Sequence, residues 1–268
     1  MKDVILWELR RRRSAIFWWA VGSIALTAMI MLLFPSIQDK AADMNKMLNQ
    51  LPPELRGFKT GGAAHVDVGD PLQFMNAQIF YSTLPIVWII LAITRGANIL
   101  GREEQTKTLE LLLARPISRG ALLAAKATAF FLEFMTVVLA TFGAIAMLTP
   151  AVGMQIGPGT LLAATLLTGL FCFSFGYLAY VLQAASSVTK RVATATAVAI
   201  GFGGYILASL SSLTDWLKYP VKFVPYHYFE PLKILQGDAT PGLYVYFALV
   251  FMMGSTVAYL GFRRRDIE

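Results

Sequence analysis

The sequence predicts an all-α membrane protein, with six transmembrane helices in one domain over residues 1–268. Hydrophobic residues make up 56% of the chain and charged residues only 15%, whereas a soluble domain carries about 25% charge. Six stretches are long and apolar enough for a helix to cross a bilayer. This composition excludes a soluble globular domain and a disordered chain. The predicted spans are Ala15–Phe34, Ile79–Leu100, Ala121–Leu148, Thr160–Val181, Val192–Leu213 and Gly242–Phe262.

Positive charge is divided unevenly between the predicted loops. Six spans put both termini on one side of the membrane, and that side holds 16 of the 23 Lys and Arg residues. The positive-inside rule places such loops in the cytoplasm. We therefore expect a multi-pass protein of the cell (inner or plasma) membrane with cytoplasmic termini. The net charge of +7 then reflects the membrane topology, and the basic residues are expected to contact membrane lipid. No nucleic-acid partner is expected.

Three segments are expected to lie outside the spans. Residues 1–14 favour a cytoplasmic or interfacial helix, although the charges of Arg10–Arg13 would also serve as a topology signal alone. Residues 35–78 form an outer loop, in which an amphipathic helix is predicted before Pro52 and Pro53. Residues 214–241 form a second outer loop that prolines divide into short helices. The apolar positions at helical spacing in the first outer loop are Ile37, Ala41, Met44, Leu48 and Leu51.

Small residues recur at every fourth position in the fifth predicted span. Such residues let neighbouring helices approach closely. The sequence therefore predicts a helix interface along this span, either within the chain or across a dimer. The two series are Ala193, Ala197 and Gly201, and Ala195, Ala199 and Gly203.

The cytoplasmic loop of residues 101–120 combines leucines with charges of both signs. Thr108–Arg115 favours a short helix, which Pro116 ends, and Ser118 is placed to cap the third span. A helix of this kind between two spans is suited to docking a cytoplasmic partner, because force applied to it would move both spans. The alternative is a solvated connecting loop, which has little need for three consecutive leucines.

The same loop resembles the signature of type-2 ABC transporter permeases. That signature runs roughly Glu-Glu-x-x-Gly-Thr-Leu-Glu-Leu-Leu-Leu-Ala-x-Pro-Val-Ser-Arg, followed by a Lys. Lys107 replaces the usual glycine, while Tyr226–Pro231 and Arg263–Ile267 are similar to the family's segments before and after its last span. The matching positions are Glu103, Glu104, Thr108, Leu109, Glu110, Leu111, Leu112, Pro116, Ser118, Arg119 and Lys126.

The resemblance implies the membrane-spanning permease subunit of an ATP-driven exporter. Two cytoplasmic ABC ATPase subunits would bind ATP and Mg, so this chain would need no cofactor and would not be an enzyme. A second permease copy or a paralogue would complete a dimer around the cavity. The loop would be the coupling helix that docks on the ATPase. Its expected docking residues are Glu103, Glu104, Lys107, Thr108, Leu109, Glu110, Leu112, Leu113 and Arg115.

The motifs absent from the sequence fit this division of labour. There is no Gly-x-x-x-x-Gly-Lys-[Ser/Thr] phosphate loop, and no metal site is expected because His65 and His227 stand alone. An intramembrane enzyme without a recognisable motif remains an alternative. A secondary transporter or channel that needs no ATPase is another, although the paired halves of such transporters are not evident.

Three ionisable residues fall inside the predicted spans. A charge at the bilayer centre costs at least about 2.5 kcal/mol, so Arg95, Lys126 and Glu133 are functional candidates. We expect Glu133 to pair with Arg95 or Lys126 and to join spans two and three into one lever. Alternatively, the two cations reach the inner interface through their long side chains, and Glu133 contacts a proton or the substrate.

The cargo is expected to be hydrophobic or amphipathic, such as a drug, a peptide or a lipid-like molecule. This follows because few charges are available inside the spans. Polar or aromatic side chains on spans two and five are candidates for lining the cavity, although packing between helices would equally explain them. They are Trp88, Thr94, Asn98, Thr196, Tyr205 and Ser209.

Overall fold

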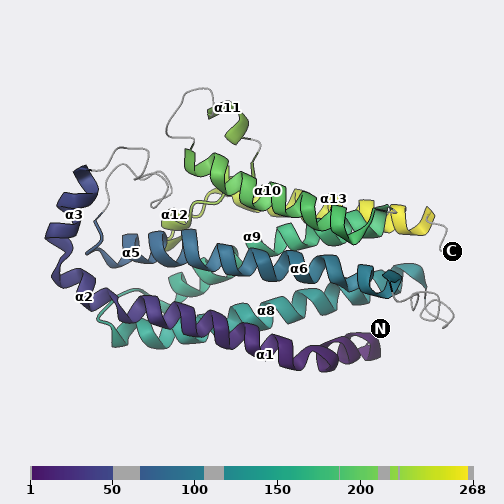
Figure 1. Cartoon of the computed structure of the whole chain (residues 1–268), viewed down its shortest axis with the longest axis horizontal. Coiled ribbons are helices and arrows are strands. Elements are labelled where there is room, and N and C mark those ends of the chain that lie inside the picture. Colours follow the sequence, from purple (N-terminus) through teal and green to yellow (C-terminus); the bar gives the residue numbers. More distant parts are fainter. Residues whose placement is uncertain are drawn as a thin grey trace.

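The computed structural model is an all-helical bundle (Figure 1). It describes residues 2–50, 67–105, 118–186, 188–210, 218–222 and 224–264. Within these ranges six helices are long and apolar enough to cross a membrane, as the sequence predicts. The six are α1 (Lys2–Leu32), α6 (Leu84–Gln105), α8 (Arg119–Ala151), α9 (Pro158–Ala185), α10 (Lys190–Leu210) and α13 (Pro241–Arg264).

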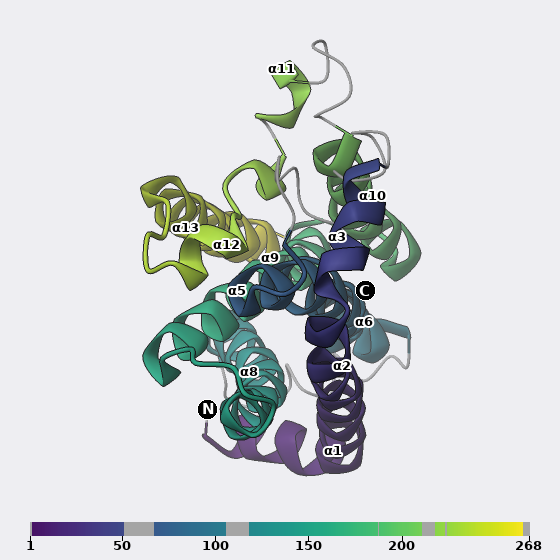
Figure 2. The same ribbon diagram turned by 90° about the vertical axis from the view of Figure 1, so that its left-hand side faces the viewer.

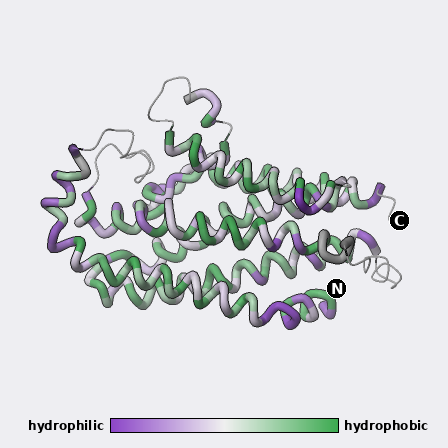
Figure 3. The backbone as a smooth tube through the Cα atoms, in the orientation of Figure 1, coloured by the Kyte–Doolittle hydropathy of each residue, from purple (hydrophilic) through white to green (hydrophobic). Residues whose placement is uncertain are grey.

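The long helices form three layers of two. Figures 1 and 2 show α1 with α8 in one layer, α6 with α9 in the middle, and α10 with α13 in the third. The middle helix α9 contacts α6, α8, α10 and α13, so its sequence is apolar on every side, as a fully surrounded helix requires. Figure 3 shows apolar residues along the middle of the bundle and hydrophilic residues gathered towards its ends.

Several helices continue beyond the predicted spans. The first segment and the first span are one helix, α1, whose N-terminal turns run across the end of the bundle towards α8 (Figure 2). The second candidate span ends at Leu100, as predicted, but helix α6 continues through Gly101 to Gln105. A single glycine costs a helix only about 1 kcal/mol relative to alanine, and the four residues after Gly101 are good helix formers. The first five residues of the predicted loop of residues 101–120 are therefore part of helix α6.

An irregular helix precedes α6. The short helix α5 (Pro71–Phe74) leads into a π-helix, η1 (Met75–Thr83). Asp70 caps α5 by accepting hydrogen bonds from the N–H groups of Leu72 and Gln73. Pro85 explains the widened turns before α6, because its ring pushes away the carbonyl one turn earlier and it has no N–H to offer.

Helices α6 and α9 touch backbone to backbone at two glycines. A Cβ atom on Gly96 would lie 1.9 Å from the carbonyl oxygen of Gly176, and one on Gly176 would lie 2.2 Å from that of Ala92. Only glycine leaves room for this contact.

The small residues of the fifth span are divided between two surroundings. Ala193, Ala197 and Gly201 are buried on the inner face of α10. Ala195 and Ala199 are exposed. The predicted interface within the chain therefore involves one of the two series, and the closest helix contact lies elsewhere, between α6 and α9.

Two short helices follow α1 at the far end of the bundle. Helices α2 (Phe34–Asp39) and α3 (Ala41–Gln50) occupy the region where an amphipathic helix is predicted. Leu51 and the two prolines, Pro52 and Pro53, lie outside the described residues.

Hydrogen bonds connect α3 to the segment before α5. The Asn45 side chain donates to Asp67 over 2.7 Å, and the Val68 N–H donates to Asn45. The Asn45 hydrogen bond, helped by the Gly69 N–H, lowers the pKa of the Asp67 carboxyl.

The proline-rich segment before α13 folds back onto the bundle from Pro225 onward. It contains α11 (Lys218–Val221), a 3-10 helix η3 (Pro225–His227) and α12 (Pro231–Leu235). The Phe229 ring stacks on Phe171 of α9 with 4.2 Å between centroids, and Tyr226 packs edge-on against the same ring at 4.8 Å. These aromatic contacts explain why so apolar a segment is not a free loop.

Adding one methyl group at the α6–α9 contact is expected to destabilise the fold. Gly176→Ala would press a Cβ into the Ala92 carbonyl, and overpacking of this kind costs about 1–3 kcal/mol. Gly143→Ala on α8 is the matched control, because a Cβ there meets nothing within 4 Å. Thermal unfolding of the purified proteins in detergent should show a lower midpoint for Gly176→Ala alone. Equal midpoints would contradict the contact.

Candidate functional site

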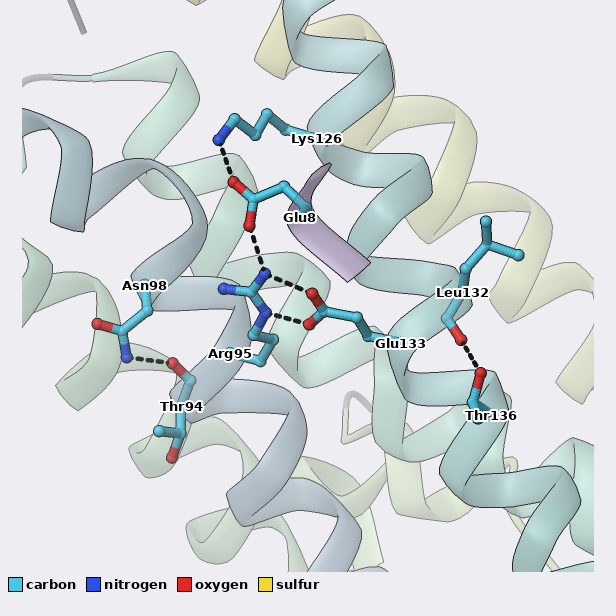
Figure 4. Close-up of polar contacts among 8 residues, drawn as sticks. All are labelled: Glu8, Thr94, Arg95, Asn98, Lys126, Leu132, Glu133 and Thr136. Atoms are coloured by element: carbon cyan, nitrogen blue, oxygen red, sulfur yellow. Dashed lines mark hydrogen bonds and ion pairs between the residues drawn. The ribbon is translucent and has the colours of Figure 1, made fainter. Parts of the chain in front are cut away.

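Four charged side chains meet where α1, α6 and α8 converge. Glu8 comes from α1, Arg95 from α6, and Lys126 and Glu133 from α8 (Figure 4). Lys126 and Glu133 are seven residues apart and therefore share one face of their helix. We call these four residues the ion cluster.

Arg95 lies at the centre of the ion cluster. Its Nη2 atom donates to Glu133 Oε1 over 2.7 Å, and its Nε atom donates to Glu133 Oε2. This two-pronged geometry fixes the relative orientation of both groups. The same Nη2 atom lies 3.2 Å from Glu8 Oε2, and the other Glu8 oxygen accepts from Lys126 Nζ over 2.5 Å. One chain of ion pairs thus connects three helices.

The ion cluster is almost completely buried. Exposed fractions are 0% for Lys126, 1% for Glu8, 4% for Glu133 and 5% for Arg95. A buried charge is tolerated only when it is paired and hydrogen-bonded, and here two carboxylates balance two cations. Removing any one member would leave a charge uncompensated, so the four residues act as a unit.

The sequence anticipates part of this arrangement. The expected pairing of Glu133 with a cation is present, with Arg95 as the partner. Arg95 and Lys126 do not point away from each other to the interface, since both bind Glu8. Glu8 is the member that the sequence analysis missed. Arg95 and Lys126 carry two positive charges, whereas Glu133 carries one negative charge. This excess of one positive charge in the predicted spans indicates that a second acidic residue is needed.

The candidate cavity residues on α6 have different surroundings. Trp88 is fully buried in the core, with its ring edge-on to Phe134 at 6.3 Å between centroids. Thr94 lies nearly two turns further along α6 and is exposed. Asn98 is half-buried, and its side-chain amide donates to the Thr94 carbonyl over 2.6 Å (Figure 4). Trp88 thus serves packing, whereas Thr94 and Asn98 reach the surface beside the ion cluster.

The candidates on α10 are not gathered with those on α6. Ser209 is buried and hydrogen-bonded to the Tyr81 hydroxyl over 3.1 Å. The Tyr205 ring lies 5.6 Å from the Tyr81 ring, and Thr196 is half-buried two turns earlier on the helix. Tyr205 and Ser209 thus connect α10 to Tyr81 of η1. A shared cavity between two permeases stays a prediction.

The predicted coupling loop connects α6 to α8, and its two flanking helices meet it at the end of the bundle that carries both described termini (Figure 1). Ser118 caps α8 as expected, since its hydroxyl accepts from the Ala121 N–H over 3.2 Å. Glu103 and Glu104 belong to the last turns of α6. Residues 106–117 lie outside the described ranges. These residues include the predicted docking residues Lys107, Thr108, Leu109, Glu110, Leu112, Leu113 and Arg115.

Comparison with known families decides the class of protein. A family model described as "ABC-2 family transporter protein" matches residues 4–262, which is nearly the whole chain. The chain belongs to the ABC-2 transporter family. No curated protein matches it. ABC-2 membrane subunits are typically non-catalytic and typically pair with ATPase subunits. In the described part of this ABC-2 subunit, no three potential ligands gather into a metal site.

The ion cluster predicts non-additive effects of substitution. Glu133→Leu leaves Arg95 with a buried excess charge, and Arg95→Met leaves two carboxylates facing one cation. Breaking a buried pair in this way costs about 3–5 kcal/mol. The double variant retains the neutral Glu8–Lys126 pair, so its thermal unfolding midpoint in detergent should exceed that of either single variant.

The control for this experiment is Asp3→Asn on the same helix as Glu8. Asp3 is exposed, so its loss should leave the midpoint unchanged, whereas Glu8→Gln should lower it. Strictly additive losses in the Arg95 and Glu133 variants would show that the four groups do not act as a unit.

Proposed function

We propose that this ABC-2 membrane subunit is the permease of an ATP-driven exporter. Separate cytoplasmic ATPase subunits would supply the energy, and the cargo would be hydrophobic or amphipathic. The observation that carries the proposal is the buried ion cluster. It ties α6 and α8, the two helices that flank the coupling loop, to each other and to the start of α1.

The proposed mechanism transmits force from the loop to the spans. ATPase closure would move residues 101–120, and the loop joins directly to α6 and α8. Because separating a buried ion pair costs several kcal/mol, the ion cluster would keep α1, α6 and α8 together while they move. Their displacement against a second permease copy or a paralogue would alternate access to a cavity between the two.

The charge distribution supports an apolar or amphipathic cargo. Arg95, Lys126 and Glu133 already bind one another or Glu8. The candidate cavity residues of α6 near them, Thr94 and Asn98, are uncharged. A strongly charged hydrophilic cargo would find little compensation there.

The orientation can be tested with single cysteines. We propose that the termini face the cytoplasm and that α3 lies outside. Cys172 is the one native cysteine, and it is buried, so the unmodified protein provides the blank. Asp43→Cys on α3 should react with a membrane-impermeant maleimide in intact cells, and Lys2→Cys should react only after permeabilisation. Labelling of Lys2→Cys in intact cells would contradict the orientation.

The coupling role can be tested by co-purification. The permease should retain a soluble subunit that carries a phosphate loop, and the complex should hydrolyse ATP. Glu110→Lys reverses a charge on the docking loop, and like charges at an interface cost several kcal/mol. Retained ATPase activity should therefore fall at least about tenfold.

Asp43→Lys makes the same charge change on exposed α3, at the opposite end of the bundle, and should retain the partner. If transport of a candidate cargo persists without any ATPase partner, the chain is instead a secondary transporter or a channel.

A further inference from the structure

A cleft opens between α1, α6 and α8 beside the ion cluster. Its α1 wall consists of Arg12, Ala15, Ile16 and Trp19, which lie on one face at helical spacing. Leu91 and Thr94 of α6 and Phe134 and Val137 of α8 complete it, with Arg95 and Glu133 at one end. The space in and over the cleft, with open solvent included, is about 450 Å³.

The cleft is charged at one end and apolar along its length. Arg12 is half-buried at the charged end, whereas Arg10, Arg11 and Arg13 are exposed. From Arg12 to Trp19 is seven residues, or roughly 10 Å along the helix. Apolar side chains of all three helices line that length, so the cleft matches a ligand with an ionic head and a hydrocarbon body.

The charge of the ligand follows from the balance of the ion cluster. Glu8 and Glu133 neutralise Arg95 and Lys126, and Arg12 is a fifth charge beside them. Among the described residues, no carboxylate oxygen lies within 4 Å of Arg12. Counted over the described residues, the charged end of the cleft therefore has one excess positive charge, on Arg12, and complements an anion.

We propose that this cleft binds one anionic phospholipid, with its phosphate on Arg12 and an acyl chain along Ile16, Trp19 and Phe134. The cleft is at the end of the bundle that we propose faces the cytoplasm, where anionic headgroups attract juxtamembrane cations. Binding to the purified permease does not depend on that orientation, nor on the ATPase partner. The bound lipid would brace α1 against α6, which otherwise meet mainly through α8.

The test titrates the purified full-length permease in detergent with phosphatidylglycerol and counts bound lipids by native mass spectrometry. One saturable lipid per chain is expected, bound more tightly than phosphatidylcholine. Arg12→Gln removes a charged hydrogen-bond donor and should weaken phosphatidylglycerol binding about tenfold. Arg12→Lys should retain most of the binding, and Arg13→Gln, which removes a neighbouring exposed charge, should change it less than twofold.

The apolar half of the cleft is tested separately. Ala15→Phe fills the cleft from α1 without altering any charge, and it should also weaken binding. Unchanged thermal unfolding of each variant establishes that it is folded, and glycerol phosphate, which lacks acyl chains, should not compete.

Three outcomes would overturn the proposal. Equal losses for Arg12→Gln and Arg13→Gln, with no effect of Ala15→Phe, would show diffuse attraction to the surface. Competition by glycerol phosphate would show a site for a free anion. Loss of a permease dimer in Ala15→Phe, with lipid binding intact, would show that a second copy covers the cleft.

Discussion

The membrane interior admits charge only when charge is balanced, and this constraint determines how three of the six helices are arranged. Arg95, Lys126 and Glu133 enter spans where an isolated ion would be strongly disfavoured. They are accommodated because α1 delivers Glu8 to the same point. A well-packed apolar core of the same volume would often be as stable or more so. The contribution of the ion cluster is therefore specificity: it fixes which faces of α1, α6 and α8 meet.

The sequence predicts the parts of the fold that depend on local physics. Six spans follow from apolar length, because backbone groups in lipid must bond within the helix. Ser118 follows from the capping preference of hydroxyl side chains, and the short helices before α13 follow from the spacing of prolines. The pairing of Glu133 with a cation follows from the cost of leaving it alone.

The parts that the sequence does not predict depend on contacts between distant residues. Glu8 lies 87 positions from Arg95 and 118 from Lys126, so no periodicity connects them. The α6–α9 contact depends on where two helices cross, and Gly96 and Gly176 look no different in the sequence from glycines that face open space. Trp88 is polar enough to suggest a cavity, yet the neighbouring Phe134 places it in the core. The continuation of α6 past Gly101 reflects good helix formers that outweigh one glycine.

The ion cluster also constrains how the chain is made. Arg95 precedes Glu133 by 38 residues, so the guanidinium enters the growing chain before the carboxylate that it binds on α8. Glu8 is synthesised before both Arg95 and Glu133, on the same helix as Arg10–Arg13. The charges of these three helices are balanced only once the third of them has been made. The three helices therefore depend on one another for charge balance, and none of them is balanced alone.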